Sequence, residues 1–304
     1  MVANAKPMAV AVLGAGGVGG LLGALLTRQG DDVTFVVPER TASVLNAQGL
    51  RVESGLYGSF AVDAKAVTEL AVPVDVCVIA VKATQLEAAM ERVTKDVLGD
   101  AVVVPFLNGV DHVDVLRQRY GAAVVAGTLR VASTRTAPGL IEHSSPFVRA
   151  ELALTDQLTV EQREKALRFG RRLEAAEVEL DVRDDELAML WGKLIFLCPL
   201  ALLTTCYGIN AGTVRTTHRG EMVAVIHEIA VVAHAVGAPL SPSAAVDFFD
   251  SVPETMQSSM QHDAAAGNEL ELDAIGGAVL RASARSGIPT PMTQRLVAEL
   301  GGAP

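Results

Sequence analysis

The sequence contains a glycine-rich hexapeptide, Gly14-Ala15-Gly16-Gly17-Val18-Gly19, of a kind that binds phosphate groups. An apolar run at 9–13 precedes it and an alanine- and leucine-rich stretch follows, which predicts a strand, a tight turn and a helix. In that setting the first glycine permits the turn, the second lets a pyrophosphate approach the backbone, and the third lets the helix pack against the strand. The N–H groups at the start of the helix would then face the phosphates. A glycine turn without a ligand is the alternative, but the context favours a dinucleotide, NAD or NADP, held by Gly14, Gly16, Gly17, Val18 and Gly19.

Two polar residues follow apolar, strand-like runs. Lys82 comes directly after the run at 74–81, and Asn108 comes shortly after the run at 101–106. Ligands of open α/β sheets lie outside the carboxyl ends of the strands, so both side chains are candidates to contact a cofactor or a substrate. A solvated loop lysine and an ordinary Asn-Gly turn are the alternatives.

A third candidate, Lys193, lies within an apolar segment at 190–197. Burial removes the ammonium group from water and so lowers a lysine pKa toward neutrality, which suits proton donation to a carbonyl oxygen. The alternative is a snorkelling lysine at the start of a buried helix.

Over about the first 180 residues, which include the glycine loop, Lys82 and Asn108, segments with strand patterns alternate with segments with helix patterns. Strands are predicted at 9–13, 32–37, 74–81 and 101–106, a hairpin at 50–60, shorter strands at 122–126, 150–154 and 178–182, and helices at 41–48, 86–98 and 160–175. From residue 184 the pattern is helical, with breaks at 208–210, 237–239 and 286–289. We therefore predict an α/β protein with an N-terminal Rossmann domain, a doubly wound parallel sheet at 1–182, and an all-helical domain at 183–304. The site is expected in the cleft between them.

Composition excludes several classes of function. The 304 residues are 50% hydrophobic and 20% charged, enough for two domains with their own cores, and the net charge of −10 argues against a nucleic-acid partner. Residues 1–7 are expected to be a short disordered lead without the apolar region of a signal peptide. The apolar window at 189–207 contains a lysine and a proline, so we interpret it as a buried helix and predict no membrane span.

The cysteines carry no metal-ligand spacing, and no metal site is predicted. Cys77, Cys198 and Cys206 lie in apolar sequence, as buried thiols of a reducing compartment do, so a cytoplasmic location is expected. Apolar helices near the carboxyl end, such as 221–236, bury themselves either within one chain or across a homodimer, and the sequence leaves both open.

Taken together, these pieces resemble the ketopantoate reductase family over nearly the full length. In the first half, the glycine loop, VKATQ at 81–85, Asn108-Gly109 and PGLIEH at 138–143 match the family's motifs in order. In the second half, WGKL at 191–194, SSMQHD at 258–263 and ELD at 271–273 match its Trp-x-Lys-Leu, Ser-Ser-Met and Glu-Ile-Asp motifs. The resemblance implies a Rossmann domain followed by a helical domain.

The resemblance also implies NADPH-dependent reduction of a small-molecule 2-oxo acid to a 2-hydroxy acid, with ketopantoate as the family substrate. Lys193 would protonate the ketone oxygen, and its charge would offset the developing alkoxide. Glu271 would bind the hydroxyl end of the substrate and help to place Lys193. Further contacts would come from Ser259, on the substrate carboxylate, and from Lys82 and Asn108, on cofactor and substrate. Without the family match, Glu271 would instead be interpreted as a solvated helix carboxylate.

One departure concerns the substrate. The family has asparagines four and eight residues after the catalytic lysine, on one helix face, and this chain has Leu197 and Ala201 there. We therefore expect a more apolar pocket and a 2-oxo acid or ketone other than, or in addition to, ketopantoate. Thr204 and Thr205 are candidates to supply replacement polar contacts.

The sequence indicates only in part whether the cofactor is NADP or NAD. Where Pro38 stands the family commonly has an arginine that binds the 2′-phosphate of NADP, and Arg40 is the candidate replacement. Glu39 lies 20 residues after Gly19, close to the acidic position that binds the ribose 2′-hydroxyl of NAD. The resemblance favours NADP, with NAD as the alternative.

Two classes of function remain open. The first is an active 2-oxo acid oxidoreductase, favoured by the joint presence of Lys193, Ser259 and Glu271. The second is a catalytically idle, NAD(P)-binding regulatory protein on the same fold. Leu197 and Ala201 favour this alternative, because they replace two asparagines of the family's substrate site. A hydroxy-acid dehydrogenase differs from the first only in its physiological direction.

Overall fold

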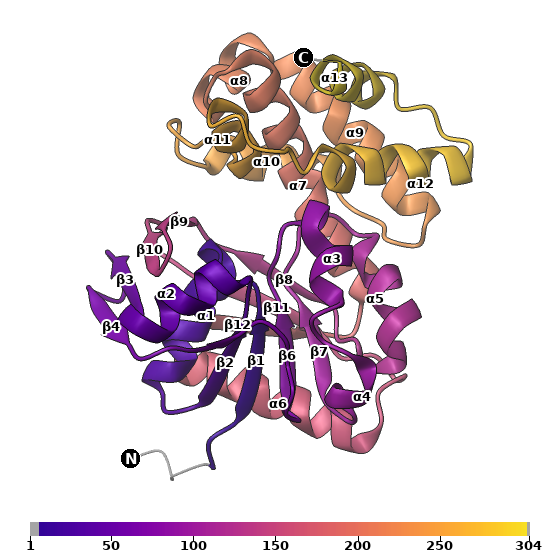
Figure 1. Cartoon of the computed structure of the whole chain (residues 1–304). Coiled ribbons are helices and arrows are strands. Elements are labelled where there is room, and N and C mark those ends of the chain that lie inside the picture. Colours follow the sequence, from indigo (N-terminus) through magenta and orange to yellow (C-terminus); the bar gives the residue numbers. More distant parts are fainter. Residues whose placement is uncertain (1–5, 303–304) are drawn as a thin grey trace. The chain divides into compact units, whose positions relative to one another are not determined.

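The structure, a computed structural model, describes residues 6–302 and consists of two compact units (Figure 1). The first unit holds the chain up to Leu107 together with Val113–Glu186. The second holds Asn108–His112 and the chain from Leu187 onward. The helical unit thus includes one short segment from the N-terminal part of the chain, where the sequence suggested a single division after residue 182. Most of the predicted lead at 1–7 lies outside the described residues.

A five-stranded parallel sheet, in the order β5–β2–β1–β6–β7, forms the centre of the first unit. Its strands are β1 (Ala9–Leu13), β2 (Asp32–Val36), β5 (Lys65–Val67), β6 (Val76–Ile79) and β7 (Val102–Pro105). The strands β6 and β7 are buried throughout, as continuous apolar runs in a parallel sheet require. Strand order reverses between β1 and β6, and ligands of such sheets bind outside the carboxyl ends of the strands at this point. The predicted Rossmann-type fold with a C-terminal helical domain is confirmed.

Helix α1 (Gly17–Arg28) packs between the parallel sheet and a second sheet, and its glycines make this possible. A Cβ on Gly23 would overlap the ring of Phe35 in β2, and one on Gly20 would lie 2.6 Å from Cδ1 of Ile141 in the second sheet. Because both faces of α1 are covered at this short range, the start of the helix is held firmly at the end of β1.

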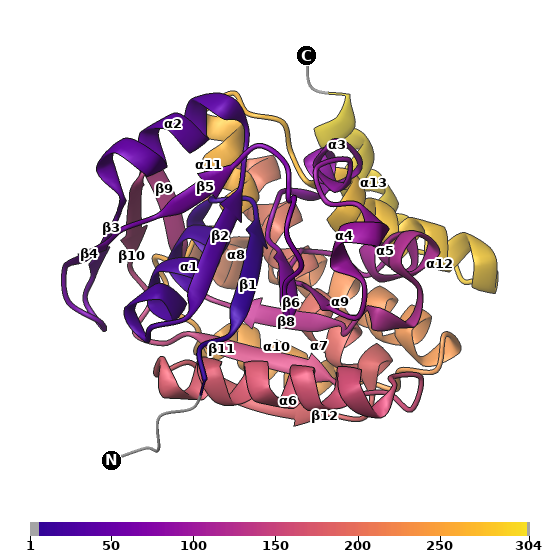
Figure 2. The same ribbon diagram turned by 60° about the horizontal axis from the view of Figure 1, so that its bottom comes forward.

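Two smaller sheets complete the first unit, in the orders β4–β3–β10–β9 and β12–β11–β8. The predicted hairpin at 50–60 is confirmed as the antiparallel pair β3 and β4. Helix α6 (Val160–Ala175) matches its predicted bounds, begins with a capping box from Thr159 and Gln162, and packs along β12 (Figure 2). The remaining elements are β3 (Leu50–Ser54), β4 (Phe60–Val62), β8 (Gly127–Arg130), β9 (Ser133–Ala137), β10 (Leu140–His143), β11 (Arg149–Ala153), β12 (Glu179–Arg183) and α2 (Glu39–Gln48).

Two sequence-based predictions in this unit are wrong in detail. The helix expected at 86–98 is interrupted: a 3₁₀ turn, η1 (Ala83–Gln85), leads into α3 (Leu86–Met90), and α4 (Lys95–Leu98) begins anew. Thr94 causes the second start, because its side chain accepts a hydrogen bond from the Val97 N–H and caps α4. The strand expected at 122–126 contributes a single bridge between Val124 and Val103, preceded by the 3₁₀ turn η2 (Gly121–Ala123).

The second unit is helical, as predicted, and has its own apolar core. Its elements are α7 (Glu186–Tyr207), α8 (Ala211–Thr217), α9 (Arg219–Ala235), α10 (Pro242–Ser251), α11 (Ser259–Ala265), the π-helical turn η3 (Asp273–Gly277), α12 (Ala278–Ser286) and α13 (Pro291–Gly301). Helix α5 (His112–Tyr120), which the sequence reading missed, begins at the last residue of the Asn108–His112 segment. The predicted breaks coincide with Gly208, Gly237 and Gly287, all with positive φ.

Helix α7 runs the full 22 residues with Pro199 inside it. It is the one helix in the described part of the chain with the length and apolarity to cross a membrane, but 67% of its most apolar window is buried inside the protein. That burial is typical of a core helix.

A carboxylate from α9 caps the start of α13. Glu228 accepts hydrogen bonds from the N–H groups of Met292 (2.8 Å) and Thr293 (2.9 Å) and from the Thr293 hydroxyl (2.7 Å). The N-cap residue itself, Thr290, makes no side-chain cap. A carboxylate at this end also interacts favourably with the helix dipole.

We expect Glu228→Gln to lower the free energy of unfolding by about 1–2 kcal/mol, because it removes the charge and one acceptor from this cap. Urea unfolding followed by circular dichroism measures the change, with Glu269→Gln at an exposed position as the matched control. Equal stability of the two variants would contradict the role of this cap.

Candidate active site

The glycine loop occupies the carboxyl end of β1, as its sequence predicts. Gly14 follows the strand with φ of +98°, a conformation that favours glycine, and its N–H donates to the Val36 carbonyl at 3.1 Å. A Cβ there would lie 2.7 Å from Cγ1 of Val81. The loop therefore makes its tight turn between β2 and the segment after β6.

The amino end of α1 is suited to an anion. Gly16 is the N-cap residue, no side chain caps the helix, and its first turn holds no acidic residue. Cβ atoms on Gly17 and Gly19 would overlap the backbone oxygens of Ser133 and Gly14, whereas a Cβ on Gly16 would meet nothing within 4 Å. Because the first N–H groups of a helix have no intrahelical acceptor, this open side offers donors to an anionic group such as a pyrophosphate.

Lys82 and Arg40 lie at this same edge of the sheet. Lys82 is half-buried and follows β6, whose Ile79 is paired with Leu13 at the end of β1. Arg40 is exposed in the first turn of α2, after β2, which also neighbours β1. The structure thus brings the glycine loop, Lys82 and the α2 turn to the carboxyl ends of three adjacent strands.

A second group of predicted residues lies in the helical unit. The Asn108 amide donates to Oε2 of Glu271 at 3.0 Å, although the two residues are 163 positions apart. Glu271 is only 8% exposed, so the solvated carboxylate that composition alone favours is wrong. Lys193 lies half-buried on α7 in the same unit.

The Asn108–His112 segment is fixed at two further points. Gly109 has φ of +85°, and a Cβ there would overlap the Ala274 carbonyl of η3. Asp111 forms an ion pair with Arg281 of α12 at 2.8 Å. The segment is therefore a fixed part of the helical unit, which explains how Asn108 reaches Glu271.

Of the two adjacent serines, the structure buries the one that was not predicted. Ser259 is the first residue of α11 and is exposed. Ser258 is 3% exposed, caps α11 through the Gln261 N–H, and shares a 2.8 Å hydrogen bond with the Thr204 hydroxyl. Ser259 is thus positioned at the surface end of this helix.

The positions that depart from the family pattern differ from each other. Leu197 is half-buried, whereas Ala201 is fully buried in the core of the helical unit. The Thr204 hydroxyl donates to the Leu200 carbonyl at 2.7 Å and also bonds Ser258, so it is already occupied. The buried hydroxyl of Thr205 has no hydrogen-bond partner among the described residues. Thr205 therefore remains the better candidate of the two for a replacement contact.

His112, which the sequence reading missed, also belongs to this group. Its ring is buried, and burial together with the nearby charge of Lys193 lowers the pKa of His112 to about 3. The only sequence signal was its place four residues after Asn108.

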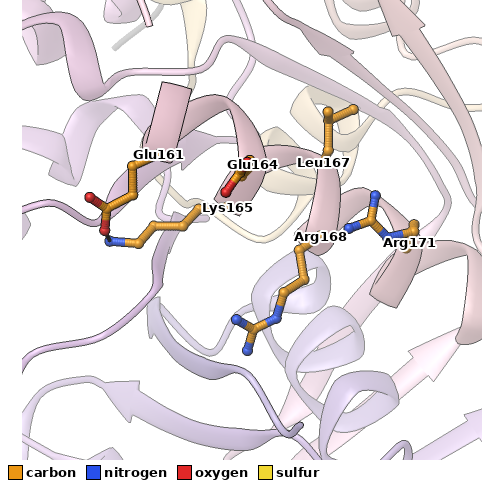
Figure 3. A pocket seen from close by; sticks show the side chains of 6 residues that line it. All are labelled: Glu161, Glu164, Lys165, Leu167, Arg168 and Arg171. Carbon is orange, nitrogen blue, oxygen red and sulfur yellow. Dashed lines mark ion pairs between the residues drawn. The ribbon is translucent and has the colours of Figure 1, made fainter. Parts of the chain in front are cut away.

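A separate surface hollow lies on α6 of the first unit and contains none of these residues. Figure 3 shows its lining, in which Lys165 pairs with Glu161 at 3.0 Å; the residues are Glu161, Glu164, Lys165, Leu167, Arg168 and Arg171. Its charged side chains are those of an ordinary solvated helix face.

Comparison with known proteins identifies two matching family models. One, described as ketopantoate reductase PanE/ApbA, covers residues 10–153, and the other, its C-terminal counterpart, covers 185–303. The 2-dehydropantoate 2-reductase of Mycobacterium tuberculosis is 30% identical over 77% of this chain and 78% of its own length. The uncharacterized oxidoreductase YkpB of Bacillus subtilis is 29% identical over 95% of this chain and 96% of its own.

Solved structures show the same fold. A ternary complex of D-mandelate dehydrogenase with NADH and anilino(oxo)acetate superposes with a TM-score of 0.88 at 20% identity, covering 96% of this chain and 97% of that one. The 2-dehydropantoate 2-reductase of Geobacter metallireducens superposes with a TM-score of 0.86 at 24% identity, covering 97% and 99%.

We predict that Gly16→Ala leaves the fold intact and weakens dinucleotide binding at least about tenfold, or ~1.4 kcal/mol. The added methyl meets open space in the protein but occupies the side from which the pyrophosphate approaches. Nucleotide fluorescence titration gives the Kd, and thermal unfolding checks stability. Gly55→Ala, another glycine of this unit with open space around it, is the control. Unchanged affinity in Gly16→Ala would show that the nucleotide binds elsewhere.

Proposed function

The chain belongs to the ketopantoate reductase PanE/ApbA family of NAD(P)H-dependent oxidoreductases, and from this premise we propose that it reduces a 2-oxo acid to a 2-hydroxy acid with Lys193 as the proton donor. The observation that carries the proposal is the partly buried Asn108–Glu271 hydrogen bond in the unit that also holds Lys193. A buried carboxylate, a half-buried amide and, in the same unit, a half-buried lysine offer a small substrate both acceptors and donors.

The bound cofactor supplies the hydride that reduces the carbonyl carbon. The Lys193 ammonium donates a proton to the carbonyl oxygen as the new C–H bond forms, which leaves a neutral amine and a hydroxyl group. Before transfer is complete its charge stabilises the developing alkoxide, an effect worth ~3–4 kcal/mol for one well-placed donor. Where the substrate is ketopantoate, Glu271 accepts a hydrogen bond from its hydroxyl end, and Asn108 holds Glu271 in place at 3.0 Å. In the first unit, Lys82 and the amides of the glycine loop offer positive charge and N–H donors to the phosphates.

The substrate is proposed to carry an apolar group. Leu197 offers a hydrocarbon surface where the family pattern has an asparagine amide, and a site that hydrogen-bonds a hydroxyl discriminates far better than an apolar one. A fold relative with NADH and anilino(oxo)acetate supports a bulky 2-oxo acid. Ketopantoate itself belongs in the test panel because the family's named relatives are 2-dehydropantoate 2-reductases.

We expect Lys193→Ala to lower kcat by about 10²–10⁴ while leaving the Kd of the dinucleotide unchanged, because only the proton donor is lost. Absorbance at 340 nm follows NADPH and NADH oxidation with a panel of 2-oxo acids that includes ketopantoate and bulkier apolar members. Lys95→Ala, at an exposed lysine of α4, is the control. Tight NADPH binding by the wild type without turnover of any 2-oxo acid would favour the idle nucleotide-binding protein instead.

We further propose NADP as the preferred cofactor, with Arg40 as the residue that recognises the 2′-phosphate. A charge-assisted hydrogen bond contributes about 1.5–3 kcal/mol, so Arg40→Ala should raise KM for NADPH by about tenfold to a hundredfold and leave KM for NADH nearly unchanged. Arg51→Ala, at an exposed arginine on β3, is the matched control. A wild type that prefers NADH, and that loses this preference in Glu39→Gln, would assign the site to NAD.

A further inference from the structure

The imidazole of His112 is buried without a hydrogen-bond partner. The residue is 6% exposed, and neither Nδ1 nor Nε2 has a partner among residues 6–302. Buried polar groups in native proteins are nearly always paired, and each one left unpaired costs about 1–3 kcal/mol. Such a ring calls for a function that an apolar residue could not supply.

The other buried histidine among residues 6–302 shows what a structural role looks like. His143, in β10, is 2% exposed, and its ring nitrogens bond the hydroxyls of Ser54 at 2.8 Å and Ser145 at 2.9 Å. It ties β10 to the neighbouring strand β3 and has both nitrogens satisfied. His112 lacks any such pairing, so structural tethering does not account for it.

The His112 ring is neutral at every ordinary pH. Burial and the charge of Lys193 both lower its pKa, to about 3, and its place as the first residue of α5 adds the positive end of a helix dipole. A neutral imidazole has one N–H donor and one nitrogen that accepts. The charged group of α7 that acts on this ring is the Lys193 ammonium, which is a hydrogen-bond donor.

The location of His112 is fixed with respect to the proposed substrate groups. It ends the Asn108–His112 segment, which Gly109 and the Asp111–Arg281 ion pair hold against η3 and α12. The titratable groups of the helical unit around this segment are Lys193 on α7, Glu271 bonded to Asn108, Asp111, and Arg281 on α12, which also pairs with Asp273.

We propose that His112 is a positioning residue for Lys193: its accepting ring nitrogen takes a hydrogen bond from the ammonium group during turnover and aims another ammonium proton at the substrate carbonyl. This inference rests on the proposed function of Lys193. A carboxylate in the same place would orient the lysine too, but it would favour the charged form strongly and so oppose release of the proton. A neutral acceptor orients the donor and leaves its proton transferable.

The test compares His112→Leu, which removes the acceptor, with His112→Gln, which restores an acceptor oxygen. We expect His112→Leu to lower kcat by about tenfold to a hundredfold at unchanged KM for the dinucleotide, because a misaimed donor slows only the chemical step. Since the lost hydrogen bond favoured the charged lysine, the basic limb of the kcat–pH profile should also move to lower pH. His112→Gln should recover most of kcat and restore the basic limb of the kcat–pH profile to its wild-type position. The matched control is His143→Leu, which should lower the melting temperature without shifting the basic limb of the kcat–pH profile.

A second readout does not depend on activity. Nitrogen-15 NMR of the imidazoles in the wild type and in Lys193→Met follows the ionisation of His112, and loss of the neighbouring cation should raise its pKa. A His112 signal insensitive to Lys193→Met would overturn the proposal even where His112→Leu fails to fold. An inactive Lys193→Ala beside fully active His112→Leu and His112→Gln would overturn it while leaving the proposed function intact. Full activity of Lys193→Ala would instead overturn the proposed function.

Discussion

The hydrogen bond between the Asn108 amide and the Glu271 carboxylate is the interaction on which the proposed substrate site depends. It joins a five-residue segment of the N-terminal half to the helical unit, at 3.0 Å and with Glu271 almost fully buried. A buried carboxylate without such a donor would leave its oxygens unpaired at a cost in stability. The close approach of Gly109 to η3 supports the same attachment from the backbone side.

The two units contribute chemistry of different kinds. In the first unit the proposed cofactor contacts come mainly from the backbone, because a helix that starts with glycines presents N–H groups without side chains in the way. In the helical unit the proposed function rests on side chains: Lys193 as the proposed proton donor, with Glu271 and Asn108 proposed to orient the substrate. Helix α1 is packed tightly on both faces, whereas α7 carries Lys193 within an apolar stretch.

The sequence predicted the features that depend on local spacing. Gly14 marked the turn after β1, and the glycines at 208, 237 and 287 marked the ends of helices, since each has the positive φ that such a turn or helix end demands locally. Features that depend on contacts between distant parts of the chain could not be predicted from the sequence without the family resemblance. Neither the burial of Glu271 nor that of His112 follows from neighbouring residues, because partners such as Asn108 lie far along the chain. The break after α3 was also missed, since a threonine cap is a weak signal inside an apolar pattern.

Isotope transfer shows directly whether this protein catalyses hydride transfer from NADPH to the carbonyl carbon of a 2-oxo acid. NADPH deuterated at the transferable position of the nicotinamide ring would be incubated with the protein and each 2-oxo acid, and the products analysed by mass spectrometry. We expect a 2-hydroxy acid carrying one deuterium on its hydroxyl-bearing carbon, with the highest yield from an apolar substrate. Oxidation of the cofactor without deuterium in any hydroxy acid, or no oxidation at all, would rule out the proposed reduction of a 2-oxo acid.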